Sequence, residues 1–276
     1  MVSLDHSTQQ KAAEDGLISF LFQGQKDIVM PDWKALPCKS EAQGTCLELP
    51  VFYWEGSPNE PHLFYLPSEY DTLDSLFSLF EALKLLDFSI FYCDYSALWR
   101  KAPHLSIEAM CEAITHALQS VSAHMEQGSR NGPLTVMGRS IGSAFAIHSA
   151  ACMCKRTACL VVESGFANTA DLLQKMGKNT LELSEDPFSN RAKMRTYTKP
   201  VLFLHSSRDE YTTLTQVEWL VMESRSKATQ FQVVPSPSRN NLFGSTSEFY
   251  LQALKDFIYL RMGRRPKLKR HLNKMN

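Results

Sequence analysis

Short apolar runs alternate with longer amphipathic segments from about residue 46 to residue 260. The runs are rich in β-branched and aromatic residues, and Pro, Gly, Ser or Asp bound them, as in strands. We expect strands at Leu47–Trp54, His62–Leu66, Phe88–Cys93, Leu134–Gly138, Cys159–Glu163, Val201–His205 and Gln230–Val234. Helical periodicity between them predicts helices at 71–86, 106–126, 141–155, 213–226 and 246–262. This alternation is typical of α/β proteins, in which helices cover both faces of a mostly parallel sheet.

Three segments depart from the alternation and define the predicted domain organisation. Residues 1–45 are a polar and mixed leader before the α/β body at 46–260. Residues 167–198 are helical in composition but more polar, at a place where a small helical cap could be inserted over an active site. Residues 261–276 form a basic tail with seven Lys/Arg and no acid. We expect a single α/β domain with a cap, flanked by the leader and the tail.

The formal net charge of zero is unevenly spread along the chain. The tail holds seven of the 29 basic residues, which leaves 22 basic against 29 acidic residues in 1–260. Such a run is either a solvated terminus or a contact for an acidic protein, RNA or an anionic surface. It has no interleaved aromatic residues for base stacking, so sequence-specific nucleic-acid binding is not predicted.

Cysteine usage and the absence of targeting signals bear on compartment and cofactors. The chain has seven cysteines, an odd number, and we expect most of them to be buried thiols in a reducing compartment. Cys152-Met153-Cys154 lacks a second ligand pair, so we expect no metal site, and nothing predicts a cofactor. The first residues do not resemble a signal peptide, and no apolar run is as long as a membrane span. The sequence therefore predicts an intracellular, cytoplasmic protein.

The motif most informative about chemistry is the G-x-S-x-G pentapeptide at 138–142, with Ser140 at its centre. It follows an apolar run, Leu134–Met137, and opens a helical stretch of small residues. This is the strand–turn–helix setting of a nucleophile elbow, where a serine hydroxyl is exposed on a strained corner. The alternative is a serine that caps a helix after a glycine turn.

Three segments together resemble the α/β-hydrolase superfamily, in its small bacterial-type, peptidase-like or thioesterase-like serine hydrolase branch. They are Val136–Ala144, Val162–Thr169 and Pro200–Glu210, and the resemblance spans about residues 46–260. It implies an α/β-hydrolase fold with a helical cap.

The resemblance also assigns candidate catalytic residues. It implies Ser140 as the nucleophile, Asp209 as the triad acid and the backbone N–H of Ile141 as an oxyanion donor. Asp209 follows an apolar strand, on the kind of loop where α/β active sites gather. An aspartate there could also serve only to cap the next helix.

The histidine that the resemblance implies is missing. Arg239 stands at its position in the 235–244 loop, and no histidine lies between His205 and His271. An arginine side chain stays protonated, so it cannot accept the proton of the serine; beside Asp209 it would form a salt bridge. The other candidate bases, each expected to be structural or at the surface, are His104, His116, His124, His148, His205 and His271.

The second oxyanion donor is altered as well. Pro67 stands where the resemblance implies a glycine, and proline has no N–H. Ser68 could still donate its N–H, but Glu69 would bring a negative charge close to a developing oxyanion. A glycine-rich stretch expected after Tyr95 is replaced by Ser-Ala-Leu-Trp-Arg-Lys at 96–101.

Two hypotheses follow from these features. The favoured one is a catalytically impaired pseudoenzyme that uses the scaffold for binding or assembly, with the leader and the tail as contact surfaces. The alternative is an active serine hydrolase that cleaves a small ester, thioester or amide through Ser140 with a non-standard base.

Overall fold

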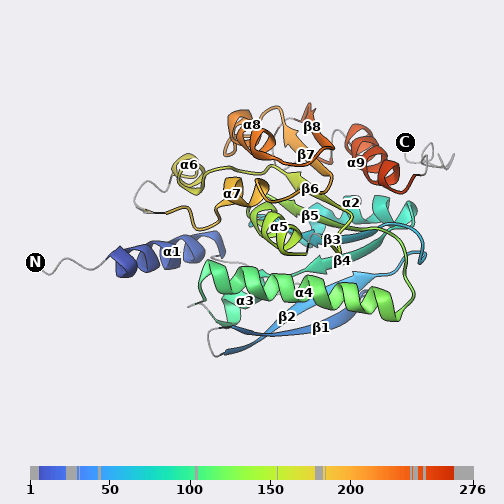
Figure 1. Cartoon of the computed structure of the whole chain (residues 1–276), viewed down its shortest axis with the longest axis horizontal. Coiled ribbons are helices and arrows are strands. Elements are labelled where there is room, and N and C mark those ends of the chain that lie inside the picture. Colours follow the sequence, from blue (N-terminus) through green and yellow to red (C-terminus); the bar gives the residue numbers. More distant parts are fainter. Residues whose placement is uncertain are drawn as a thin grey trace, which may run out of the picture.

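The computed structural model describes residues 6–22, 30, 32–42, 45–102, 105–153, 155–177, 183, 185–236, 238, 242–244 and 247–263. Within them, eight strands form one sheet in the order β1-β2-β4-β3-β5-β6-β7-β8 (Figure 1). The strands are β1 Lys34–Ala42, β2 Thr45–Trp54, β3 His62–Leu66, β4 Ser89–Cys93, β5 Leu134–Arg139, β6 Cys159–Glu163, β7 Val201–Ser206 and β8 Thr229–Val234. The β1–β2 and β2–β4 pairs are antiparallel and the other neighbours are parallel. This is an α/β-hydrolase fold.

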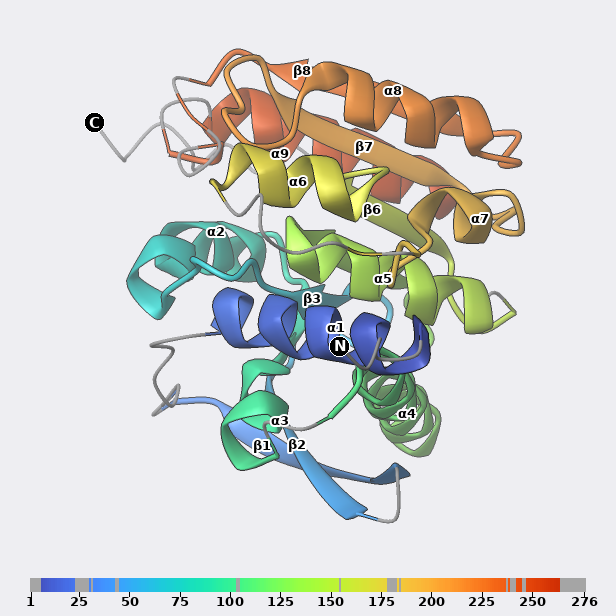
Figure 2. The same cartoon turned by 90° about the vertical axis from the view of Figure 1, so that its left-hand side faces the viewer.

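Helices cover both faces of the sheet, as the alternation of apolar runs and amphipathic segments predicts (Figure 1, Figure 2). One face buries apolar side chains of seven of them: α1 His6–Phe22, α3 Ser96–Lys101, α4 Ile107–Gln127, α5 Ile141–Cys152, α6 Thr169–Lys175, α7 Asn190–Met194 and α8 Leu214–Glu223. The other face buries side chains of α2 Leu73–Leu85 and α9 Ser247–Arg261. The alternation of side chains along β5 shows the two cores, since Val136 belongs to the first and Met137 to the second.

The predicted strands and helices of the body match those of the structure to within three residues at their ends. His62–Leu66 and Cys159–Glu163 are predicted with the observed bounds. The strand burial explains the agreement, because every residue of β3 to β7 is buried and most residues of each strand are therefore apolar.

The boundary of the body at residue 46 needs correction. The expected leader 1–45 contains α1 and the edge strand β1, which pairs with β2 along its whole length. Leu17 and Leu21 of α1 are buried in the core on the α5 side of the sheet. The side chain of Gln10 exchanges hydrogen bonds with the backbone of Glu185. β1 is difficult to predict from the sequence because it carries lysines and a proline, and few of its side chains point into the core.

The segment expected as a cap, 167–198, contains the short helices α6 and α7. The ring of Phe188, which lies between them, packs edge to face against Phe145 of α5 and against Phe166. Residues 178–182 and 184, Arg239, His104, His271 and the tail beyond Gly263 lie outside the described residues. That this segment covers a substrate stays a prediction.

Candidate active site

Ser140 stands at the junction of β5 and α5 with φ 52° and ψ −121°, and it is fully buried. A positive φ is strained for a residue with a side chain, and such strain tends to gather at functional sites. The N–H of Ser140 donates to the carbonyl of Glu163 on the neighbouring strand β6. The junction is thus held to the sheet. We call residues 138–142 the Ser140 turn.

The two glycines of the Ser140 turn occupy positions that no side chain could share. A Cβ on Gly138 would lie 2.2 Å from the carbonyl oxygen of Gly142. A Cβ on Gly142 would lie 2.2 Å from the carbonyl oxygen of Pro67 and 2.3 Å from that of Leu66. Backbone atoms cannot yield at these distances, so the turn requires glycine at both places.

The carboxylate of Glu69 occupies the space in front of Ser140. The Ser140 hydroxyl donates to Glu69 Oε1 at 3.0 Å, and the N–H of Ile141 donates to Glu69 Oε2 at 3.4 Å. Glu69 is itself buried. The N–H at the start of α5, which the resemblance assigns to an oxyanion, therefore holds an anion that belongs to the protein.

The loop 67–72 that carries Glu69 is braced at several points. The hydroxyl of Tyr95 donates to the carbonyl of Pro67 at 2.6 Å, and burial, with the nearby Glu69 charge, raises the pKa of Tyr95 well above its usual value. The N–H of Ser68 donates to Asp71 Oδ2 at 2.8 Å. Ser68, the expected second oxyanion donor, thus has its N–H directed at Asp71.

Arg139, the residue before the serine, is the centre of a buried ionic network. Its guanidinium lies 2.6 Å from Asp71 Oδ1 and 3.1 Å from Glu163 Oε1. The Tyr250 hydroxyl donates to Glu163 Oε2 at 2.6 Å. Burial alone would lower the pKa of Arg139, but the two carboxylates outweigh it and raise the pKa. Burial and Glu163 raise the pKa of Tyr250 well above its usual value, so the phenol stays protonated.

Asp209 lies on the loop after β7, where the sequence places it. Its Oδ1 accepts the N–H groups of Tyr211 at 3.0 Å and Thr212 at 2.9 Å, the pattern of an aspartate that closes a turn. Its Oδ2 is buried without a hydrogen-bond partner among the described residues. Asp209 closes this turn rather than capping the next helix, because α8 begins after Thr213 and has no side-chain cap, and one oxygen of Asp209 remains for a partner.

Two aromatic rings bring the loops after β3 and β7 together. The rings of Tyr70 and Tyr211 are stacked with centroids 6.4 Å apart and an angle of 29° between their planes. Tyr70 directly follows Glu69, and Tyr211 is two residues beyond Asp209. Asp209, the expected triad acid, and Glu69 therefore belong to loops that contact each other.

Four of the described histidines bond to groups other than Ser140. Nε2 of His205 lies 2.9 Å from the carbonyl oxygen of Thr212. The remaining contacts are His62 with the Pro58 carbonyl, His124 with Glu55 and His148 with Cys152. His116 is exposed on α4. Burial lowers the pKa of both His62 and His148 to about 4, which weakens each as a proton acceptor.

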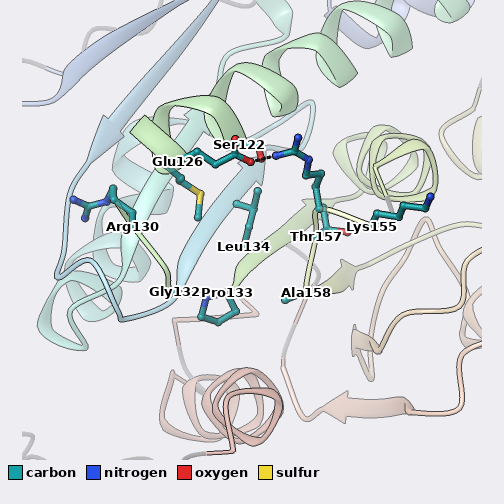
Figure 3. Close-up of a pocket in the computed structure, with 11 residues that line it drawn as sticks. Ser122, Glu126, Arg130, Gly132, Pro133, Leu134, Lys155, Thr157 and Ala158 are labelled. Carbon is teal, nitrogen blue, oxygen red and sulfur yellow. Dashed lines mark ion pairs between the residues drawn. The ribbon is translucent and has the colours of Figure 1, made fainter. Parts of the chain in front are cut away.

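Two cavities lie elsewhere. One, of about 260 Å³, adjoins the ionic network between α2 and α9, where Arg139, Glu163 and Tyr250 line it. The other, of about 380 Å³, lies at the start of β5, far along the strand from Ser140. Figure 3 shows that the head groups of Arg130 and Lys155 point away from this second cavity, while Arg156 pairs with Glu126 at its rim. The charged side chains around this cavity therefore do not converge on a common point where a ligand could bind.

The described residues contain no group of three or more His, Cys, Asp or Glu side chains placed to hold a metal ion. In the same part of the chain, none of the helices combines the length and the apolar character needed to span a bilayer.

Sequence reasoning missed the network around Arg139. Its members come from the loop after β3, from β5, from β6 and from α9. The signal for this network is an arginine inside the pentapeptide, at the end of a strand that is predicted to be buried. A buried guanidinium requires carboxylate partners. The pairing of Ser140 with Glu69 was anticipated only as a nearby charge.

No protein-family model matches the sequence, and no curated protein matches it significantly. Solved structures with the same fold include esterases. Esterase Pf2001 from Pyrococcus furiosus has a TM-score of 0.67 at 12% identity, over 86% of this chain and 95% of its own. Est1E from Butyrivibrio proteoclasticus has a TM-score of 0.62 at 13% identity, over 83% and 99%. The esterase domain of a Rhodothermus marinus protein has a TM-score of 0.58 at 13% identity, over 84% and 99%.

Proposed function

We propose that this α/β-hydrolase-fold protein is a catalytically impaired relative of serine hydrolases, with a binding or assembly role. The observation that carries the proposal is the Glu69 carboxylate, which engages both the Ser140 hydroxyl and the Ile141 N–H. An acyl substrate would have to place its carbonyl oxygen where this carboxylate lies.

The charge of Glu69 opposes acyl transfer. In that reaction negative charge develops on the carbonyl oxygen, and the N–H groups of an oxyanion hole stabilise it. Loss of one such donor costs on the order of 10²–10³ in kcat. Here Ile141 is occupied by an anion and the Ser68 N–H is directed to Asp71. The ground state therefore offers an incoming substrate neither of the two donors expected from the sequence.

The absence of a catalytic base is the second observation that supports an impaired site. Arg239 replaces the expected histidine in the sequence, and four of the described imidazoles bond elsewhere. Removal of the base from a serine triad costs on the order of 10⁶ in kcat. A protein that lacks both features retains the fold without efficient turnover. The basic tail 261–276 then remains the candidate contact for an acidic protein, RNA or an anionic surface.

Active serine hydrolysis of a small ester, thioester or amide is the second candidate, and two observations favour it. Esterases share the fold, and Est1E has been solved with ferulic acid bound. Ser140 also retains a strained backbone, which costs on the order of 1–3 kcal/mol and is unnecessary in a mere scaffold. In such a hydrolase, Glu69 would accept the Ser140 proton, and the Ile141 N–H would then be available to the carbonyl oxygen of the substrate.

A fluorophosphonate probe separates the two candidates. If the site is impaired, the parent protein stays unlabelled at probe concentrations that label an active serine esterase. Stoichiometric labelling that Ser140→Ala abolishes would establish the hydrolase instead.

Variants at Glu69 then show what this residue does. If Glu69 blocks the site, Glu69→Gln becomes labelled under conditions that leave the parent unlabelled. If Glu69 is the base, the same variant loses labelling. Glu48→Gln, an identical change at an exposed position of β2, is the matched control and should behave as the parent.

A further inference from the structure

The two edges of the sheet differ in how they are protected. Natural edge strands usually carry charges or proline, which discourage pairing with another chain. β1 at one edge contains Pro37, two lysines and a glutamate. β8 at the other edge reads Thr-Gln-Phe-Gln-Val-Val, without charge or proline. Among the described strands, only β7 pairs with β8.

The hydrogen bonds to β7 show which backbone groups of β8 face outward. The N–H of Val201 donates to the carbonyl of Ala228, and the N–H of Ser207 donates to that of Val234. Even-numbered positions of β8 therefore direct their backbone groups toward β7. Since these directions alternate along a strand, Thr229, Phe231 and Val233 direct their N–H and C=O groups to the open edge.

Exposed apolar side chains gather on the elements beside this edge. Helices α8 and α9 flank β8 on opposite faces of the sheet (Figure 1, Figure 2). These three elements carry five of the nine large apolar side chains exposed among the described residues: Leu214, Met222, Val233, Phe249 and Leu260. Met222 is 81% exposed and Val233 is 41% exposed. The surface around this edge therefore holds more than half of the large apolar side chains exposed among the described residues.

We propose that this surface binds a second copy of the chain, with the two β8 strands antiparallel about a twofold axis at Phe231. In this register Phe231 faces Phe231 of the second copy, and Thr229 faces Val233 of the second copy. These are the positions whose backbone groups point outward, so each outward N–H and C=O gains a partner. A register shifted by two residues would leave some of them unpaired.

In the same register, the α8 face of one sheet continues into the α8 face of the other, and likewise for the α9 faces. Phe231 packs toward the core that holds α8, and Val234 belongs to the core that holds α9. A twofold axis normal to the sheet keeps these faces aligned, so α8 comes beside its copy and α9 beside its copy. The uncharged strand brings no like charges into contact. A self-complementary edge of this kind favours a second copy over an unrelated strand.

The oligomeric state of the full chain tests the proposal. We expect sedimentation velocity to show a dimer at micromolar concentration. Val233→Lys should weaken dimerisation by at least about tenfold, because the lysine removes apolar contact and adds charge at the edge. Leu85→Lys, at a comparably exposed position on α2, is the control and should leave the dimer unchanged. A monomeric parent, or a dimer insensitive to Val233→Lys, would overturn the proposal.

Amide hydrogen exchange tests the register. In the dimer the N–H groups of Thr229, Phe231 and Val233 should exchange at least about tenfold more slowly than in Val233→Lys. The N–H groups of Gln230 and Gln232 should be protected in both, because they face β7. Protection of β8 that appears only on addition of another protein, with the parent alone a monomer, would assign the edge to a different partner.

Discussion

Arg139 and Asp71 join the Ser140 turn to the loop that carries Glu69, with Arg139 Nη1 2.6 Å from Asp71 Oδ1. Asp71 also accepts the N–H of Ser68, next to Glu69. The ion pair therefore sets the position of the carboxylate that faces Ser140.

Removal of the Arg139 charge should be strongly destabilising. Arg139→Met leaves Asp71 and Glu163 buried without their shared cation, and the loss of one partner of a buried pair costs about 3–5 kcal/mol. Urea denaturation should show this loss in the free energy of unfolding. Arg156→Met, which breaks an exposed pair with Glu126, should change it by less than about 1 kcal/mol. Equal effects would contradict the role given to Arg139.

A methyl group on Gly142 should disrupt the packing of the Ser140 turn on β3. The Cβ would lie 2.2 Å from the Pro67 carbonyl oxygen, so the turn and the 67–72 loop would have to separate. We expect Gly142→Ala to lower the free energy of unfolding by at least about 2 kcal/mol. Gly128→Ala, at a helix end where the nearest atom is a flexible side chain, should cost much less.

The burial of Phe188 should stabilise the 167–198 segment. Phe188 is 1% exposed, and its ring packs against Phe145 and Phe166. Phe188→Ala should cost about 3–5 kcal/mol in thermal or urea unfolding, because it leaves a cavity among aromatic rings. Phe77→Ala, at a residue of α2 that is 64% exposed, is the control, and we expect a change below about 0.5 kcal/mol.

Mild acid should destabilise the fold through His62. Burial lowers its pKa to about 4, whereas an imidazole in the unfolded chain titrates near 6.5. Between these values the unfolded chain binds a proton that the folded chain does not, so the free energy of unfolding falls as pH falls.

The histidine variants isolate this effect. His62→Gln should lose about 1–2 kcal/mol less than the parent between pH 7 and pH 5 in urea titrations. His116→Gln, at an exposed position of α4, should follow the parent. Parallel curves for the parent and His62→Gln would contradict the assignment.

The central strands could be predicted from the sequence because both of their faces are buried. Val136 and Met137 of β5 enter different cores, so the middle of the strand is apolar on both faces and its signal is local. α1 and β1 give no such signal. Leu17 and Leu21 belong to one short apolar stretch at 17–22 and Cys38 to a strand of mixed composition, and only the contact with the rest of the protein shows that they belong to the core.

The sequence by itself determined the α/β architecture, the strained turn around Ser140 and the absence of a histidine near position 239. Backbone sterics and apolar periodicity act over a few neighbouring residues, so they can be recognised from the sequence alone. Only the tertiary structure decided that Glu69 fills the space before Ser140 and that Arg139 joins Asp71 to Glu163. These contacts connect residues up to 71 positions apart, and ionic and hydrogen-bonding partners at such separation are specified by the packing of strands.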